Sequence, residues 1–345
     1  MPTENAPYFQ DESVTLHHGD ALDLPLPDSS VDLVVTSPPY FGLRSYQDNG
    51  EHYAGQIGSE TTPAEFVDAL IAATAEMVRV LKPSGSIWVN LGDKYAERTG
   101  PERLAHADTD AWVKRPNYRA PRRSYGFKPK SLMGLPWRYA LRCIDDLGLI
   151  LRAELIWDKP NGMPESVTDR VRRSHEQWFH FTTRPRYFAN VDQVRETPSG
   201  YHRGPVAVAQ IPGQKHRAML HTSNPLGKLS GSVWHIPTQP LKVPESLGVD
   251  HFAAFPMEWP RRIIQGWSPV GGIVLDPFGG TGTTALMAKT LGRQGISVDM
   301  SEDYCRLARW RTTDPDQIAS AMQVAKPAKQ VEGQWDLFME TGDAS

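Results

Sequence analysis

Strand-like and helix-like patterns alternate in two parts of this chain and are separated by an irregular middle region. Short apolar runs predict strands, and apolar positions three or four residues apart predict helices. In chain order, the expected strands cover residues 14–17, 31–36, 86–90, 150–157, 272–276 and 295–298, and the expected helices cover residues 63–81, 136–147, 283–291 and 302–311. The strands are apolar enough to lie inside a sheet covered on both faces. The pattern therefore predicts an α/β protein.

The first expected helix has a clear start signal. Thr62 stands at the N-cap, Pro63 occupies the first helical position, and Glu65 completes a capping box. From residue 159 to 250 the sequence instead breaks into short pieces rich in Pro, Gly, His and Arg, and no helix of useful length is expected there. Two regular parts therefore flank an irregular one.

A glycine-rich run follows the strand at 272–276 and opens the next expected helix. It reads Asp276-Pro277-Phe278-Gly279-Gly280-Thr281-Gly282-Thr283. Glycine removes the Cβ that would block a ligand, and the amides of a helix N-terminus suit an anion such as a carboxylate. Asp299 ends the following strand, near the ~20-residue offset at which an acid binds ribose hydroxyls in nucleotide folds. The absence of G-x-G-x-x-G disfavours a dinucleotide site, and a turn that serves packing alone is the other interpretation.

A stiff proline pair ends the strand at 31–36, within the run Thr36-Ser37-Pro38-Pro39-Tyr40. Consecutive prolines fix φ twice and leave carbonyls as fixed acceptors. Acceptors on Ser37 and Pro38, held at the two N–H positions of a nucleobase amine, would free its lone pair for attack on a methyl group. Tyr40 offers a face for a base taken out of a duplex. A rigid surface turn with a buried tyrosine is the alternative.

Composition limits the class of protein. The chain has 345 residues, of which 39% are hydrophobic and 22% charged, enough for one large core or a core plus a small module. No run of about 18 apolar residues suggests a membrane span, and a cytoplasmic location is expected. Cys143 and Cys305 are far apart, and the histidines lack ligand spacing, so neither a disulfide framework nor a metal site is predicted.

Positive charge gathers locally although the net charge is only −3. Three basic clusters lie in or near the irregular middle, and solvated loops are their simpler interpretation. Because all three lie in irregular stretches, contacts with DNA phosphates are favoured. The residues expected to bind DNA are Arg115, Arg119, Arg122, Arg123, Lys128, Arg172, Arg173, Arg203, Lys215 and Arg217.

These motifs give the chain a family resemblance. The chain resembles the β-class DNA amino-methyltransferases of bacterial and phage restriction-modification type. In that family an S/D-P-P-Y motif precedes the recognition region and an F-x-G-x-G motif comes last, which is the order of the two motifs here. Further matches lie around Asp20, at residues 81–93, 157–176 and 251–256, and the resemblance spans about residues 14–312. It implies a Rossmann-like methyltransferase sheet, mostly parallel and seven-stranded with a circularly permuted motif order, and S-adenosylmethionine as cofactor.

The resemblance also implies roles for individual residues. The catalytic residues are Ser37, Pro38, Pro39 and Tyr40, and the cofactor-binding residues are Asp20, Phe252, Asp276, Phe278, Gly280, Gly282, Thr283 and Asp299. Methylation of cytosine C5 would need a nucleophilic cysteine beside a proline in the catalytic loop. Cys143 and Cys305 instead fall inside expected helices as small core residues.

The target base is predicted from Ser37, because Ser at the first motif position goes more often with N4 of cytosine and Asp with N6 of adenine in this family. Adenine N6 stays the alternative. Methylation of RNA or of a protein amide is a rival activity, disfavoured by the motif order and the basic middle region. A catalytically silent DNA-binding regulator is a rival from another class, and the intact motifs argue against it.

Four segments are expected along the chain. They are a catalytic half at 14–160 with a basic insertion at about 95–130, a target-recognition region at 161–250, a cofactor-binding half at 251–315, and a tail at 316–345. Double-stranded DNA is the expected partner, with the target base flipped into the cleft between the motifs. The sequence does not decide between a monomer and a homodimer, nor whether a companion restriction endonuclease exists.

Overall fold

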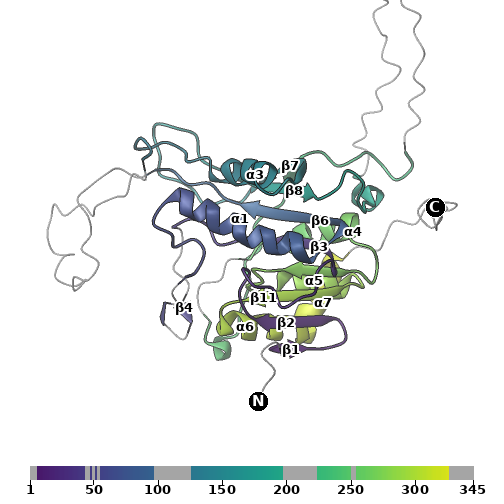
Figure 1. The fold of residues 1–345 in the computed structure, drawn as a ribbon. Helices are drawn as coiled ribbons and strands as arrows, with labels where there is room; N and C mark the ends of the chain where they lie inside the picture. Colours follow the sequence, from purple (N-terminus) through teal and green to yellow (C-terminus); the bar gives the residue numbers. More distant parts are fainter. Residues whose placement is uncertain are drawn as a thin grey trace, which may run out of the picture.

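The computed structural model describes residues 6–42, 47–48, 51–52, 55–96, 126–196, 224–249 and 254–325 (Figure 1). The strands are β1 (Phe9–Gln10), β2 (Val14–His18), β3 (Val31–Thr36), β4 (Gln47–Asp48), β5 (Glu51–His52), β6 (Leu81–Leu91), β7 (Ile150–Asp158), β8 (His175–Thr182), β9 (Val233–His235), β10 (Ile273–Asp276) and β11 (Gln294–Asp299). The α-helices are α1 (Pro63–Val80), α3 (Leu135–Asp145), α4 (Glu258–Trp267), α5 (Thr283–Thr290), α6 (Glu302–Thr313) and α7 (Pro315–Val324). Two short 3₁₀ helices, η1 (Val191–Val194) and η2 (Glu245–Leu247), complete the described elements.

One mixed sheet organises the described residues, in the order β1-β2-β11-β10-β3-β6-β8-β7-β9. The five strands from β2 to β6 in this order run parallel to one another, whereas β8 is antiparallel to both of its neighbours. The predicted Rossmann-like, mostly parallel sheet is confirmed. The predicted count of seven strands is wrong for the whole sheet, because the short strands β1 and β9 extend the seven at its two edges.

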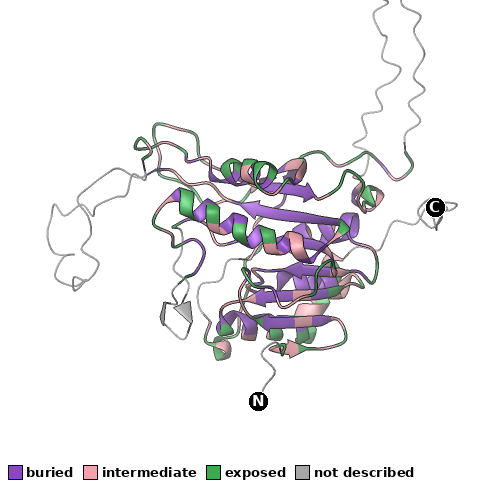
Figure 2. Ribbon diagram, in the orientation of Figure 1, coloured by how far each residue is buried: buried purple, intermediate pink, exposed green. Residues whose placement is uncertain are grey.

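Hydrophobic cores lie on both faces of this sheet. Side chains of α1 and α3 pack on one face with Val34 and Phe181, and side chains of α4, α5 and α7 pack on the other with Leu33 and Val35. Figure 2 shows buried strands between helices that are buried on one side and exposed on the other. Covered faces explain why β3 has apolar residues on both sides at Leu33, Val34 and Val35.

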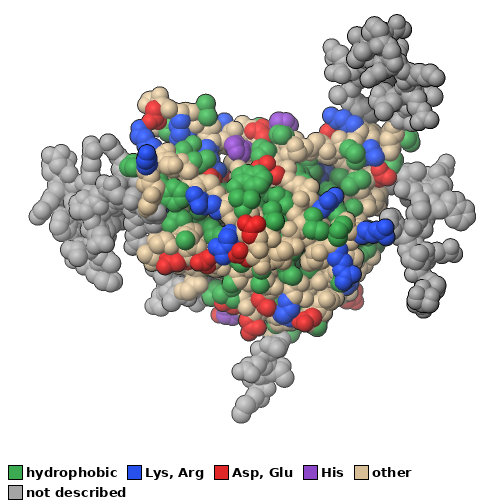
Figure 3. All heavy atoms as spheres, turned by 45° about the horizontal axis from the view of Figure 1, so that its top comes forward, with side chains coloured by type: hydrophobic (Ala, Val, Ile, Leu, Met, Phe, Trp, Pro, Cys, Tyr) green, Lys and Arg blue, Asp and Glu red, His purple; other side chains and the backbone are tan. Residues whose placement is uncertain are grey.

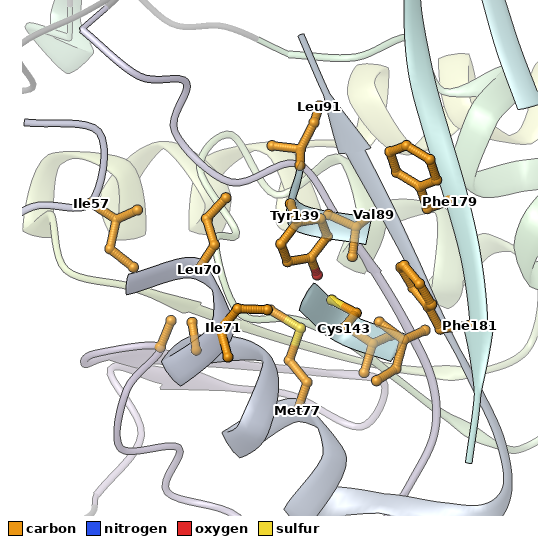
Figure 4. Close-up of a cluster of buried hydrophobic side chains, with 14 of the residues drawn as sticks. Ile57, Leu70, Ile71, Met77, Val89, Leu91, Tyr139, Cys143, Phe179 and Phe181 are labelled. Atoms are coloured by element: carbon orange, nitrogen blue, oxygen red, sulfur yellow. The ribbon is translucent and has the colours of Figure 1, made fainter. Parts of the chain in front are cut away.

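The first core shows why α1 forms where the sequence predicts it. Thr62 Oγ1 accepts a hydrogen bond from the Glu65 amide, and the Glu65 carboxylate accepts one from the Thr62 amide, so the predicted capping box is confirmed. The apolar stripe of α1 then meets α3, where Tyr139 and Cys143 lie beside Phe181 and Met77 (Figure 4). Both cysteines, Cys143 in α3 and Cys305 in α6, are buried as predicted.

Three of the longer elements were not predicted. Strand β8 lies in the stretch expected to be irregular, and its polar residues obscure the strand pattern: His180, for example, is buried, bonds to Ser86 Oγ at 3.0 Å and stacks on Trp88. Helix α4 contains Pro260 and Gly266, which interrupt its pattern. Helix α7 covers the beginning of the segment predicted as a tail. Within the described residues, no helix is long and apolar enough to cross a membrane.

Candidate active site

The two motifs meet because their strands are neighbours. Strands β3 and β10 are parallel and pair Leu33 with Val274, so the loops that follow them leave the same edge of the sheet. A hydrogen bond of 2.6 Å from Thr36 Oγ1 to Asp276 Oδ1 joins the two strand ends. The structure thus brings together the diproline corner and the glycine turn, which lie far apart in the sequence.

Two connected cavities open between these corners. The first, of about 660 Å³, is lined by Asp20, Ala21, Ser37, Pro39, Gln56, Ile57, Pro277, Phe278, Gly280, Asp299, Met300 and Tyr304. The second, of about 890 Å³, is lined by Ser37, Pro38, Tyr40, Asn90, Trp157, Lys159, Glu176, Ala254, Phe255, Asp276, Phe278, Gly279, Gly280, Thr281 and Thr283. Ser37, Phe278 and Gly280 line both. These volumes include space open to solvent at the cavity mouths, so the two cavities form an open cleft at the edge of the sheet.

Glycine is required at two positions of the turn. A Cβ on Gly279 would lie 1.7 Å from Ser297 Oγ, and Gly282 has a φ of +73° with a Cβ position 2.9 Å from Ala308. Gly282 is also the N-cap of α5 and brings no side-chain acceptor to that helix end. The turn therefore packs tightly against β11 and α6 and leaves backbone amides of α5 facing the site.

Asp299 holds the turn from the end of β11. Its Oδ2 accepts a hydrogen bond of 2.7 Å from the Gly280 amide, and its Oδ1 accepts one of 2.9 Å from the Ser301 amide. Both carboxylate oxygens of Asp299 therefore hold backbone beside the first cavity, which Asp299 lines. Asp20 lines the same cavity, and its Oδ1 accepts a bond from the Leu22 amide.

Asp276 lies beneath both corners. Its carboxylate accepts hydrogen bonds from Thr36 Oγ1, Thr284 Oγ1 and the Phe278 amide. Burial raises the pKa of Asp276 to about 6, while the two threonine hydrogen bonds oppose that increase. Because its carboxylate bonds to Thr36 at the end of β3 and to the Phe278 amide in the glycine turn, Asp276 fixes the two loops relative to each other.

Asn90 orients the catalytic loop and was not singled out by the sequence. Its Nδ2 donates to the Gln177 carbonyl at 3.0 Å, which turns Oδ1 toward the diproline corner. There Oδ1 accepts hydrogen bonds from Ser37 Oγ at 3.3 Å and from Tyr40 OH at 2.8 Å. Because the Ser37 hydrogen is directed to Asn90, the lone pairs of Ser37 Oγ are free to accept from a ligand. The sequence signal that could have identified Asn90 is its position as a polar residue near the end of the buried strand β6.

Tyr40 is supported from two sides. A Cβ on Gly92 would lie 2.6 Å from Tyr40 Cε2, so the ring lies against bare backbone there. The Tyr40 hydroxyl is also 2.9 Å from Glu176 Oε2, and Glu176 forms an ion pair with Lys159, whose ammonium lies over the Trp157 ring. These contacts hold the ring in one place at the wall of the second cavity.

The predicted DNA-binding residues are only partly described. Lys128 and Arg172 are exposed, and Arg173 donates a hydrogen bond to the Asp93 carbonyl just after the end of β6. Figure 3 shows Lys and Arg side chains interspersed with Asp and Glu on the face it presents, without a single basic block among the described residues. Arg115, Arg119, Arg122, Arg123, Arg203, Lys215 and Arg217, and the cofactor candidate Phe252, lie outside the described residues.

No group of three or more His, Cys, Asp or Glu side chains able to hold a metal occurs in the described part of the chain. The site is instead made of a glycine turn, an acid at the end of the next strand and a diproline corner, all at the carboxyl edge of one sheet. This arrangement defines the class of Rossmann-like methyltransferases.

Comparison with known proteins gives the family. The family described as DNA methylase matches residues 31–309. The chain is 38% identical over 305 residues to the Type II methyltransferase M.XycI of Xanthomonas campestris pv. cyanopsidis, covering 85% of this chain and 86% of that protein, and 36% identical over 285 residues to M.SmaI of Serratia marcescens, covering 82% and 85%. The chain therefore belongs to the DNA methylase family, and the predicted family resemblance is confirmed.

Solved structures agree on the fold. The PvuII DNA methyltransferase, described as cytosine-N4-specific, has a TM-score of 0.62 at 19% identity and matches over 92% of this chain and 94% of its own. A DNA modification methylase of Thermus thermophilus, complexed with S-adenosyl-L-methionine, has a TM-score of 0.51 at 23% identity over 89% and 93% of the two chains. At this identity the likeness concerns the fold.

An Asp299→Ala variant tests the ribose side of the site. We expect the Kd for S-adenosylmethionine to rise about fivefold to tenfold, because hydrogen bonds worth about 1 kcal/mol or more are lost. Isothermal titration calorimetry measures the effect, with Asp299→Asn as the matched control that keeps one acceptor. An unchanged Kd in a folded Asp299→Ala protein would remove Asp299 from the binding site.

Proposed function

We propose that this DNA methyltransferase transfers a methyl group from S-adenosylmethionine to the exocyclic N4 amino group of cytosine in duplex DNA. The observation that carries the proposal is the hydrogen bond from Ser37 Oγ to Asn90 Oδ1 at the junction of the two cavities. With its hydrogen directed away, Ser37 Oγ can accept a hydrogen bond from an amine that enters the second cavity.

The first cavity fits the cofactor. Carboxylates of Asp20 and Asp299 offer acceptors for hydroxyl and amine groups, Phe278 offers an apolar surface, and the glycine turn offers space that a Cβ would fill. When bound, S-adenosylmethionine supplies a methyl group on a positively charged sulfur that a weak amine can attack. The protein's contribution is to hold the two reactants in line.

The diproline corner prepares the nucleobase amine. Ser37 Oγ and the Pro38 carbonyl accept from its two N–H groups, which favours a pyramidal nitrogen whose lone pair is directed to the methyl group. Tyr40, which lines the second cavity, stacks on the flipped base. With S-adenosylmethionine bound, the methyl carbon would pass to the nitrogen in a single displacement as its bond to sulfur broke, and the proton lost from the amine would go to water.

Target recognition is assigned to the surrounding loops. We propose that residues 161–250 read base edges and that the basic clusters grip phosphates of double-stranded DNA. A cytoplasmic location and the four-segment division of the chain stay predictions. The oligomeric state and a companion endonuclease are questions for measurements in solution.

Nucleoside analysis tests the target base. Unmethylated genomic DNA incubated with the protein and methyl-labelled S-adenosylmethionine is digested and separated, and we expect the label in N4-methylcytosine. Label in N6-methyladenine without N4-methylcytosine would assign the reaction to adenine, and label in RNA but not DNA would support the rival substrate. A protein that shifts a DNA probe and transfers no label at saturating cofactor would be a regulator. An incubation without protein serves as the control for background label.

A further inference from the structure

Arg311 is a buried cation beneath the glycine turn, and the proposed mechanism does not use it. It belongs to α6, whose Ala308 packs against Gly282, and only 4% of the Arg311 residue is exposed. Within the described residues its Nε has no hydrogen-bond partner. Burial lowers the pKa of Arg311 to about 10, with no described carboxylate acting against this. A buried charge without a counter-charge is costly, so a nearby anion would be stabilised.

The hydrogen bonds of Arg311 leave one hydroxyl hydrogen for a ligand. One guanidinium nitrogen of Arg311 donates at 2.7 Å to both Thr281 Oγ1 and Thr283 Oγ1. Since a guanidinium group cannot accept, both hydroxyl hydrogens must point elsewhere. The two Oγ1 atoms are 3.1 Å apart, so one hydroxyl donates to the other and a single hydrogen remains. Both threonines line the second cavity.

The same place is the N-terminus of α5. Gly282 caps this helix without a side-chain acceptor, so the first amides of α5 are not satisfied by a cap side chain. Amides and dipole at a helix N-terminus favour an anion. A spare hydroxyl hydrogen, open amides and a buried guanidinium therefore converge on one spot of the cavity floor.

We propose that Arg311 is a positioning residue that makes this spot a carboxylate subsite for the methionine end of the cofactor. Arg311 keeps Thr281 and Thr283 oriented as donors and supplies the counter-charge from behind them. Phe278 and Gly280 belong to the same turn and line both cavities, so a cofactor held in the first cavity reaches this spot directly. For this reason a cofactor carboxylate is favoured over a DNA phosphate. The inference rests on the proposed placement of S-adenosylmethionine.

Ligands with and without the carboxylate test this role. The Kd values of S-adenosylmethionine and its decarboxylated form are measured by calorimetry in the absence of DNA, with 5′-methylthioadenosine as a ligand that lacks the whole methionine end. We expect the unaltered protein to bind S-adenosylmethionine at least tenfold more tightly than the decarboxylated form. In Arg311→Met the Kd values of S-adenosylmethionine and its decarboxylated form should differ by less than twofold, while the Kd of 5′-methylthioadenosine stays unchanged. Arg311→Lys should restore part of the difference between the first two ligands.

Arg293 provides a matched control. It is also a buried arginine whose Nε has no partner among the described residues, and it donates to the carbonyls of Leu291 and Ser268. Because it precedes β11, it lies at the opposite end of that strand from the site. Arg293→Met should keep the ligand ratio of the unaltered protein. If Arg311→Met does not fold, Thr283→Val removes one hydroxyl with little change of shape and should lower the ratio instead.

Each outcome bears on a distinct claim. An unchanged ratio in folded Arg311→Met, or in Thr283→Val where that variant replaces it, overturns the role of Arg311. If Arg311→Met binds a DNA oligonucleotide more weakly but keeps the ligand ratio, the role of Arg311 is also overturned, and the subsite is assigned to a phosphate. A protein that binds neither S-adenosylmethionine nor 5′-methylthioadenosine would instead contradict the proposed cofactor site. The choice between cytosine and adenine is unaffected by these measurements.

Discussion

Replacing Ser37 by alanine should lower kcat for DNA methylation by about 10²- to 10³-fold, the usual effect of removing one positioned polar group at a reacting centre. The variant loses the acceptor that holds the amine in line, and its cofactor Kd should change little. Single-turnover kinetics with labelled cofactor measure the methyl-transfer step, and calorimetry measures the Kd.

Two further variants separate the chemistry of Ser37 from its packing. Ser37→Thr keeps the hydroxyl and should retain more activity than Ser37→Ala. Asn90→Ala leaves the Ser37 hydroxyl in place but removes the acceptor, 3.3 Å away, toward which its hydrogen is directed. The kcat of Asn90→Ala should lie between those of Ser37→Thr and Ser37→Ala. If Ser37→Ala methylated DNA at the unaltered rate, the acceptor role would be refuted.

Replacing Tyr40 by alanine should abolish most methylation while cofactor binding persists. Base–aromatic stacking is worth about 1–3 kcal/mol, which corresponds to about a fivefold to 150-fold loss, and the ring also fills space against Gly92. The expected result is a large fall in kcat/KM for DNA. A 2-aminopurine at the target position reports, by its fluorescence, how far the base is extruded.

Tyr40→Phe is the control for this experiment. It keeps the ring and loses the hydroxyl contacts to Asn90 and Glu176, so it should keep base extrusion and show a smaller loss of rate. Equal rates for Tyr40→Ala and the unaltered protein would exclude stacking on Tyr40, as would full extrusion of the base by Tyr40→Ala.

The sequence predicted those features that depend on neighbouring residues. The capping box at Thr62 and Glu65, the apolar strand β3 and the two motif loops are all local patterns, and each lies where it was expected. The sequence analysis expected a cleft between the two motifs, and the pairing of β3 with β10 brings both loops to the same cavities.

Other features depend on partners distant in the chain and could not be predicted. Strand β8 is a strand because β6 and β7 pair with it from both sides, although its own sequence mixes His, Glu and Gln with aromatic residues. Likewise Gly92 matters because the Tyr40 ring lies against it, and Arg311 because Thr281 and Thr283 lie above it. A single sequence contains no signal for such pairings.

The hydrogen bond between Thr36 and Asp276 spans 240 positions of the chain. During translation the ribosome therefore releases the diproline corner long before the residues that complete the cavity beside it exist. Closing so long a loop is slow relative to local folding. A nascent polypeptide interrupted before β10 therefore carries the diproline corner without the glycine turn that lines the same cavities.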